Sequence, residues 1–233
     1  PSLIEAIDSF LLACTIRHLR GQSSEHSSML VHVTRFNAVQ AHVHRSVEAH
    51  VADVQQRLRR RIGHQAIIER LASLWDSDFE DAMLAVRHVE GESAHALMPN
   101  WGQIEDALPA AVADIEVRMI NGTAGDTLDY ADQKGPGLKV IAIGGDKLAR
   151  GLTLEGLCVS YFLRASKMYD TLMQMGRWFG YRPGYLDVCR LYTTHELTQW
   201  FEHITDAAEE LREEFELMAQ SRATPRDYGL RVQ

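Results

Sequence analysis

Residues 139–185, KVIAIGGDKLARGLTLEGLCVSYFLRASKMYDTLMQMGRWFGYRPGY, decide the fold of this chain. Two short apolar runs, Val140–Ile143 and Leu157–Leu163, border a loop that begins at Gly144 and Gly145. Apolar runs of this length that end at glycines predict buried strands. Because α/β sheets bind ligands beyond the ends of their strands, the polar residues after each run predict a site at the sheet edge.

The charged residues of this stretch suit a phosphate-rich ligand. The loop after the first strand carries Asp146, Lys147 and Arg150, and the segment after the second strand carries Arg177 and Arg182 beside glycines. Guanidinium groups bind phosphate oxygens in a bidentate manner, and glycines let a ligand approach the backbone closely. These residues predict contact with a polyphosphate or with a nucleic-acid backbone. The alternative is that the arginines only hold their helix against the preceding loop.

Three segments resemble the motifs of superfamily-2 helicases. Residues 148–157 (LARGLTLEGL) resemble motif V, residues 174–182 (QMGRWFGYR) resemble motif VI, and residues 28–36 (SMLVHVTRF) resemble motif IV. All three are most similar to the Z-one domain, an endonuclease domain of helicase-like proteins in bacterial restriction and defence systems. The resemblance covers residues 28–40 and 139–194, about a third of the chain.

The resemblance implies the RecA-like second motor domain of a DNA-dependent ATPase. It implies that Arg177 and Arg182 reach the γ-phosphate, where such arginines accelerate transfer by about 10³–10⁵-fold. It also implies that Gln174, Gly151 and Thr153 contact or orient the nucleotide. Five further residues are implied to contact the DNA backbone: Thr34, Arg35, Gly145, Lys147 and Arg150.

The sequence lacks half of a helicase ATP site. It contains no Gly-x-x-x-x-Gly-Lys-Ser/Thr loop and no Asp-Glu-x-His pattern. The resemblance therefore implies that ATP and Mg²⁺ bind only together with a preceding RecA-like domain of the same chain. Three features depart from the common motifs: Gly145 and Thr153 stand where many helicases carry Thr and Asp, and the pair Trp178-Phe179 occupies a place that usually holds one residue. These departures leave unwinding, translocation and switching open as mechanisms.

Two other functions stay open. The chain can be a non-catalytic interaction module that docks a nuclease or another restriction subunit, or it can be an endonuclease itself. The nearest grouping for a metal-dependent nuclease is Asp126, Asp129 and Asp132 with Lys134. Aspartates in a loop rich in glycine and threonine are more often turn residues, so this grouping predicts catalysis weakly.

Composition narrows the class of protein. The net charge of the 233 residues is −8, which argues against binding nucleic acid by bulk electrostatics and requires a local basic patch. The basic run of residues 57–61 is typical of a solvated helix end, and His42 and His44 point to different helix sides, so no metal site is predicted. The chain has no membrane-spanning run, and its three cysteines lack disulfide or zinc spacing. These features predict a cytoplasmic protein.

Strands that alternate with helices predict the α/β class, here a RecA-like and mostly parallel sheet flanked by helices. We expect one domain over residues 1–233, with residues 62–113 as a helical insertion because that connection is unusually long. Further helices are predicted over residues 3–20, 37–61 and 195–220, and strands over 29–33, 115–120 and 185–192. The spacing of the last helix predicts a buried stripe: Trp200, Ile204, Leu211, Phe215 and Met218.

Overall fold

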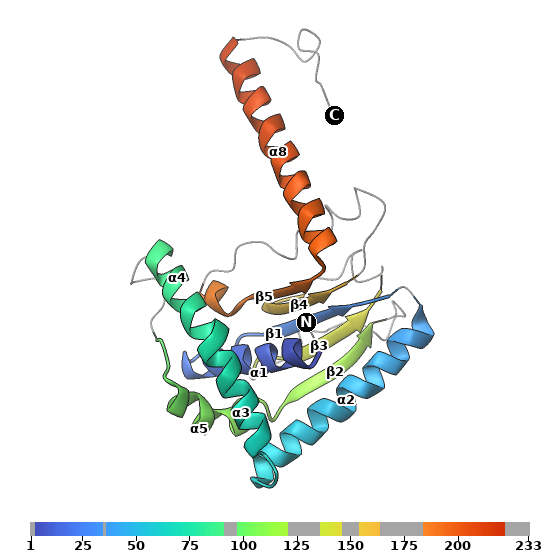
Figure 1. The fold of residues 1–233 in the computed structure, drawn as a ribbon, viewed down its shortest axis with the longest axis vertical. Helices are drawn as coiled ribbons and strands as arrows, with labels where there is room; N and C mark the ends of the chain where they lie inside the picture. The colour runs from blue at the N-terminus through green and yellow to red at the C-terminus, as the bar shows by residue number, and fades with distance from the viewer. Residues whose placement is uncertain are drawn as a thin grey trace.

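The computed structural model describes residues 3–34, 36–90, 97–120, 136–145, 154–163 and 184–221. These residues form a five-stranded, entirely parallel sheet in the order β2-β3-β1-β4-β5, with helices packed against it (Figure 1). The strands are β1 (Ser27–His32), β2 (Ile115–Ile120), β3 (Lys139–Gly144), β4 (Leu157–Phe162) and β5 (Arg190–Thr193). The prediction of an α/β protein with a parallel sheet flanked by helices is confirmed.

The three central strands are buried at every position. Both of their faces carry apolar side chains: Met29 and Ile141 belong to one apolar cluster, and Leu30 and Val140 belong to the other. A strand that is covered on both faces cannot alternate apolar and polar residues, which is why these strands appear in the sequence as continuous apolar runs.

Helix α1 (Leu3–Leu19) is the centre of one of the two cores. Twelve consecutive residues, 6–17, are buried, because the helix packs between β4 on one side and α3 and α5 on the other. Polar groups on α1 are paired inside this core. Ser9 Oγ lies 2.6 Å from Tyr192 Oη, and the carboxylate of Asp8 is bound by both nitrogens of the Arg70 fork. The sequence predicted the helix but not its burial on all sides.

Helix α2 (Asn37–Arg60) covers β2 and β3 on the same face. Its N-cap is Phe36 in an extended conformation, with no side-chain cap. Thr34 stabilises the turn into the helix, because its hydroxyl accepts a hydrogen bond from Phe36 N at 3.2 Å. The helix ends at Arg61, whose φ of 54° is left-handed.

The described residues of the helical segment after α2 form α3 (Gln65–Leu74), the π-helix η1 (Trp75–Phe79), α4 (Glu80–Glu90) and α5 (Trp101–Ala111). Asn100 starts α5 with a capping box, in which its side chain and that of Gln103 each bind the other's backbone N–H. The segment shares its apolar core with α1 and the sheet, and Trp75 is buried there. Its classification as an insertion stays a prediction.

The strand predicted over residues 185–192 is wrong in its first half. Residues Leu186–Val188 form a 3₁₀ turn, η4, and the strand begins only at Arg190. The cause is a buried ion pair, in which Arg20 donates to both carboxylate oxygens of Asp187 at 2.9 and 2.5 Å. An extended backbone would alternate side chains between the faces of the sheet, whereas the turn keeps Asp187 directed at Arg20.

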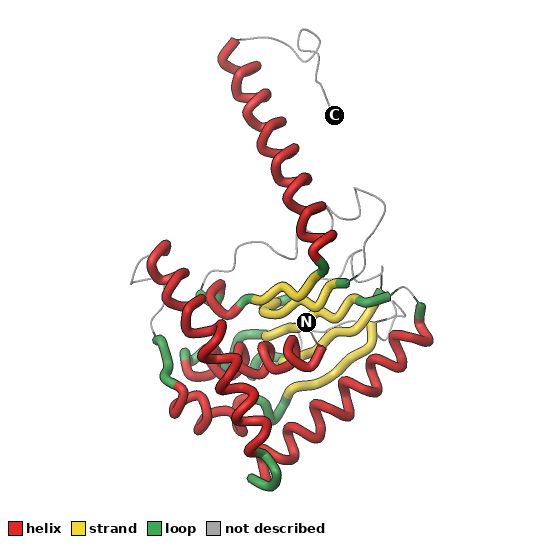
Figure 2. Tube along the Cα trace, in the orientation of Figure 1, coloured by secondary structure: helices red, strands yellow, loops and turns green. Residues whose placement is uncertain are grey.

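Helix α8 (His195–Ser221) projects from the body of the molecule (Figure 1 and Figure 2). Only its first turns pack against the sheet, through Leu197, Phe201 and Ile204. The predicted buried stripe is wrong at Trp200, Leu211 and Phe215, which are 38%, 39% and 47% exposed, and it is confirmed at Met218, which is 5% exposed. No helix among the described residues has the length and apolar character needed to cross a membrane.

Candidate functional site

The carboxyl ends of the strands meet at one edge of the sheet. Register places Val31 of β1 beside Ile143 of β3, and His32 of β1 beside Phe162 of β4. The segment that resembles motif IV contains β1, and the segments that resemble motifs V and VI come after β3 and β4 in the sequence. Parallel pairing thus brings the carboxyl ends of these three strands to one edge, although the motif V segment ends at Leu157, at the start of β4.

The edge also contains the topological switch point of the sheet. Strand β1 leads through α2 to β2 on one side, whereas its neighbour β4 leads to β5 on the other side. Ligands of α/β sheets bind outside the strand ends at such a divergence. The ring of His32 stacks on Phe162 there, with centroids 5.1 Å apart, and both residues are fully buried. The sequence placed His32 in a strand but did not mark it as a site residue.

Two of the predicted site residues lie within the described structure. Thr34 is half-buried, and its carbonyl accepts a hydrogen bond from Gln40 Nε2 at 2.9 Å. Its hydroxyl accepts from Phe36 N, and a hydroxyl that accepts one hydrogen bond can still donate one. Gly145 directly follows β3 and is buried. Both residues lie at the carboxyl edge. Thr34 follows β1 and Gly145 follows β3, and these two strands are paired neighbours.

The other predicted site residues lie outside the described residues. They are Arg35, Lys147, Arg150, Gly151, Thr153, Gln174, Arg177 and Arg182. The same holds for the aspartates and the lysine of residues 126–134.

Two helices begin at the carboxyl edge. Helix α2 begins at Asn37, directly after the turn formed by Thr34, and has no acidic residue in its first turn. Helix α8 begins at His195 after β5, and Thr194 Oγ1 accepts a hydrogen bond from Leu197 N at 3.2 Å. The N-termini of helices carry partial positive charge and unpaired N–H groups. The N-terminus of α2 therefore favours anionic groups at this edge, in a chain whose net charge is −8, whereas Glu196 in the first turn of α8 opposes them there.

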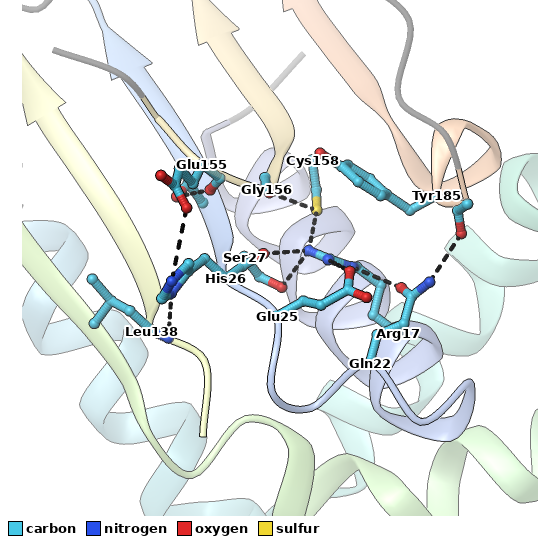
Figure 3. A network of polar contacts seen from close by, with 12 residues as sticks. Arg17, Gln22, Glu25, His26, Ser27, Leu138, Glu155, Gly156, Cys158 and Tyr185 are labelled. Carbon is cyan, nitrogen blue, oxygen red and sulfur yellow. Dashed lines mark hydrogen bonds and ion pairs between the residues drawn. The ribbon is translucent and has the colours of Figure 1, made fainter. Parts of the chain in front are cut away.

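The opposite, amino-terminal edge is held by one buried arginine, Arg17, at the end of α1 (Figure 3). Its guanidinium donates hydrogen bonds to the carbonyl of His26 at 2.6 Å, to Ser27 Oγ at 2.7 Å and to Gln22 Oε1 at 3.0 Å. It also forms an ion pair with Glu25 at 2.9 Å. Burial acts to lower the pKa of Arg17, but its contacts with neighbouring groups, including Glu25, outweigh burial and raise it. The group therefore stays charged inside the protein.

This network also anchors Gly184 and Tyr185. The guanidinium lies over the ring of Tyr185, 4.3 Å from its centroid, and Gln22 Nε2 donates to the carbonyl of Gly184 at 3.2 Å. Tyr185 is thus anchored at the amino-terminal edge, while Leu163 leaves from the carboxyl edge, where its N–H donates to the carbonyl of His32. The sequence signal for Arg17 is a lone arginine in the last turn of a mostly apolar helix, which does not by itself predict a buried charge.

A family model described as the Z1 domain matches residues 2–233. The chain belongs to the Z1 domain family. The resemblance to the Z-one domain, first noted on a third of the chain, is confirmed over almost all of it. Membership supports the coarse expectation of a Z1 domain associated with restriction or defence systems. No curated protein and no solved structure matches the chain.

Proposed function

We propose that this Z1 domain is the second motor domain of a DNA-dependent superfamily-2 ATPase in a restriction or defence system. The supporting observation concerns three adjacent parallel strands whose carboxyl ends share one edge: β1 lies within the segment that resembles motif IV, and β3 and β4 precede the segments that resemble motifs V and VI in the sequence. An edge that gathers three such segments can contact two ligands together, a nucleotide on one side and DNA on the other.

ATP would bind in the cleft between this edge and a preceding RecA-like domain. That domain would supply the phosphate loop and the groups that hold Mg²⁺, neither of which this sequence contains. From this chain, Arg177 and Arg182 would stabilise the charge that develops on the γ-phosphate, and Gln174, Gly151 and Thr153 would position the nucleotide.

DNA would lie across the ends of β1 and β3. Thr34, Arg35, Gly145, Lys147 and Arg150 would contact its phosphates, assisted by the N-terminus of α2. Because the chain is acidic overall, this contact must be local, and its affinity must fall steeply with salt. We expect Lys147→Ala and Arg150→Ala each to weaken DNA binding for all sequences and to lower the salt slope by about 1.

The decisive experiment measures DNA-stimulated ATP hydrolysis in the protein that carries both motor domains. We expect Arg177→Ala to reduce turnover by about 10³-fold or more, with unchanged thermal unfolding. We expect a smaller effect for Arg182→Ala, because Arg182 is only two residues from Gly184, which Gln22 holds at the opposite edge. Arg57→Ala is the control, since Arg57 is exposed and pairs only with Asp53 and the Gly63 carbonyl among the described residues.

The outcomes separate the competing functions. Unchanged turnover in both Arg177→Ala and Arg182→Ala would contradict the motor proposal and favour an interaction module that docks a nuclease or another restriction subunit. Metal-dependent DNA cleavage by this chain alone would instead show that it is an endonuclease.

A further inference from the structure

The apolar seam of α8 continues after the helix has left the body. Its members alternate in steps of four and three residues: Leu197, Phe201, Ile204, Ala208, Leu211, Phe215 and Met218. This is the seven-residue repeat with which two α-helices pack along their length. The first three members pack against the sheet, and the later members extend the same line away from it.

Residues 205–213 in the projecting part of α8 are open on all sides, whereas Met218 beyond them is buried. Every residue from 205 to 213 is exposed, and nine residues turn the helix more than twice, so no direction is covered over this length. Figure 1 shows the helix extending from the sheet with no described element beside it. Leu211 and Phe215 on the seam, at 39% and 47% exposure, lie with Leu217 at 54% on this projecting surface. Singly exposed apolar residues are ordinary, but a heptad-spaced set on an unsupported helix is not.

Local interactions alone stabilise this part of the helix poorly. Two pairs of like charges lie four residues apart, Glu209 with Glu213 and Glu210 with Glu214, and such pairs destabilise a helix. Most helical stability in proteins comes from packing of an apolar face, and an isolated helix of this length is marginal in water. Burial of the seam against a second helix would provide the missing stabilisation.

Charge identifies the occupant. Residues 205–217 carry six carboxylates and one guanidinium, a net charge of −5. Two copies of α8 would bring −5 against −5, whereas a helix with basic flanks would be attracted to the same surface. We propose that the projecting half of α8 docks a basic amphipathic helix of a partner protein. The partner helix presents aliphatic residues at heptad spacing to Leu211 and Phe215, and lysines or arginines to the glutamates beside them.

A designed peptide tests this directly. The probe is a fluorescein-labelled helix of about four heptads with leucines on its seam and lysines at the other positions, and its match carries glutamates in place of the lysines. Fluorescence anisotropy is recorded as the full chain is added. We expect the lysine peptide to bind and the glutamate peptide not to bind, and we expect affinity to fall as NaCl rises from about 0.05 to 0.2 M. Equal binding of both peptides, or of neither, would overturn the proposal.

Variants of exposed residues show whether the seam itself is used. We expect the double variant Leu211→Ser/Phe215→Ser to bind the lysine peptide at least about tenfold more weakly, because two large apolar side chains leave the interface. Leu217→Ser removes an equally exposed leucine off the seam and should change the affinity by less than about twofold. Circular dichroism and thermal unfolding check that both variants keep the fold.

Two further outcomes would assign the surface to a different occupant. Sedimentation of the chain as a dimer that Leu211→Ser/Phe215→Ser dissociates would show that a second copy covers the seam. Peptide binding that occurs only after residues 222–233 are deleted would show that the chain's own terminus covers it. Equal loss of binding in Leu217→Ser and in Leu211→Ser/Phe215→Ser would show that the peptide does not distinguish the seam from other apolar residues of the helix, which also contradicts the proposal.

Discussion

Replacement of Arg17 tests the claim that one buried guanidinium holds the amino-terminal edge of the sheet together. Its side chain is 2% exposed, and it joins the end of α1 to the start of β1 and to Tyr185. Arg17→Ala removes the hydrogen bonds that Arg17 donates to three uncharged oxygen atoms: the His26 carbonyl, Ser27 Oγ and Gln22 Oε1.

The magnitude follows from these contacts. A hydrogen bond from a charged group contributes about 1.5–3 kcal/mol to stability, so three contribute about 4.5–9 kcal/mol. The cation–π contact with Tyr185 adds about 1–2 kcal/mol. The ion pair with Glu25 adds little, because Glu25 is 56% exposed to water. Desolvation of the guanidinium costs several kcal/mol and offsets part of the gain. We therefore expect Arg17→Ala to lower the free energy of unfolding by about 3–5 kcal/mol, a large share of the 5–15 kcal/mol typical of a domain.

Urea unfolding monitored by circular dichroism measures this difference. Arg17→Lys keeps the charge but loses the planar fork, so it should recover only part of the loss. Arg57→Ala is the matched control, because Arg57 Nε lies 2.9 Å from Asp53, the distance of the Arg17–Glu25 pair, but both side chains are about half exposed. The control should cost less than about 0.5 kcal/mol. A loss below about 1 kcal/mol for Arg17→Ala would refute the reasoning, since desolvation would then cancel the hydrogen bonds.

Two further predictions concern buried positions. Gly156 has φ of +62°, and a Cβ there would lie 1.7 Å from the carbonyl oxygen of His26, so Gly156→Ala should cost more than about 3 kcal/mol in urea unfolding. Gly21→Ala has a similar φ of +77° but open space, so it should cost only about 1 kcal/mol, and equal losses would contradict the clash. Burial raises the pKa of Asp8, while Arg70 opposes the rise, so ionised Asp8 costs stability as the pH rises above about 3.9. Arg70→Ala removes that opposition, so the stability that this variant loses relative to the wild type should grow from pH 4 to pH 7. In an Asp8→Asn background the loss caused by Arg70→Ala should no longer depend on pH. A loss that is independent of pH while Asp8 is present would refute this.

The Arg17 network also bears on the proposed function. The segment that contains Arg177 and Arg182 begins after Leu163 at the carboxyl edge and ends at Gly184 at the other edge. Its far end is held by Gln22 and by the contact of Arg17 with Tyr185. Loss of the network would therefore release one end of the segment that the proposal places at the nucleotide.

The site is predictable from the sequence as far as strand ends are concerned. Short apolar runs locate β1, β3 and β4, and parallel pairing sends the residues after them to one edge, so the position of Thr34 and Gly145 follows from the pattern alone. The partners of Thr34 do not follow from it. Gln40 donates to the Thr34 carbonyl from the first turn of α2, a contact that depends on how the chain turns between β1 and the helix.

The sequence by itself determined the α/β class, the parallel sheet and the helix–strand order, because apolar periodicity and glycines act over a few residues and are visible locally. Only the tertiary structure decided which polar groups lie inside. Asp187 is buried because Arg20, which is distant in the sequence, satisfies it there, and the strand before Arg190 becomes a turn for the same reason. Arg17 is buried because the turn into β1 and the ring of Tyr185 surround it. The apolar pattern of α8 is the same along its length, yet Leu197 is buried against the sheet and Phe215 is exposed, because the helix extends beyond the sheet. Periodicity shows that a face is apolar, and only the position of the neighbouring elements shows what covers it.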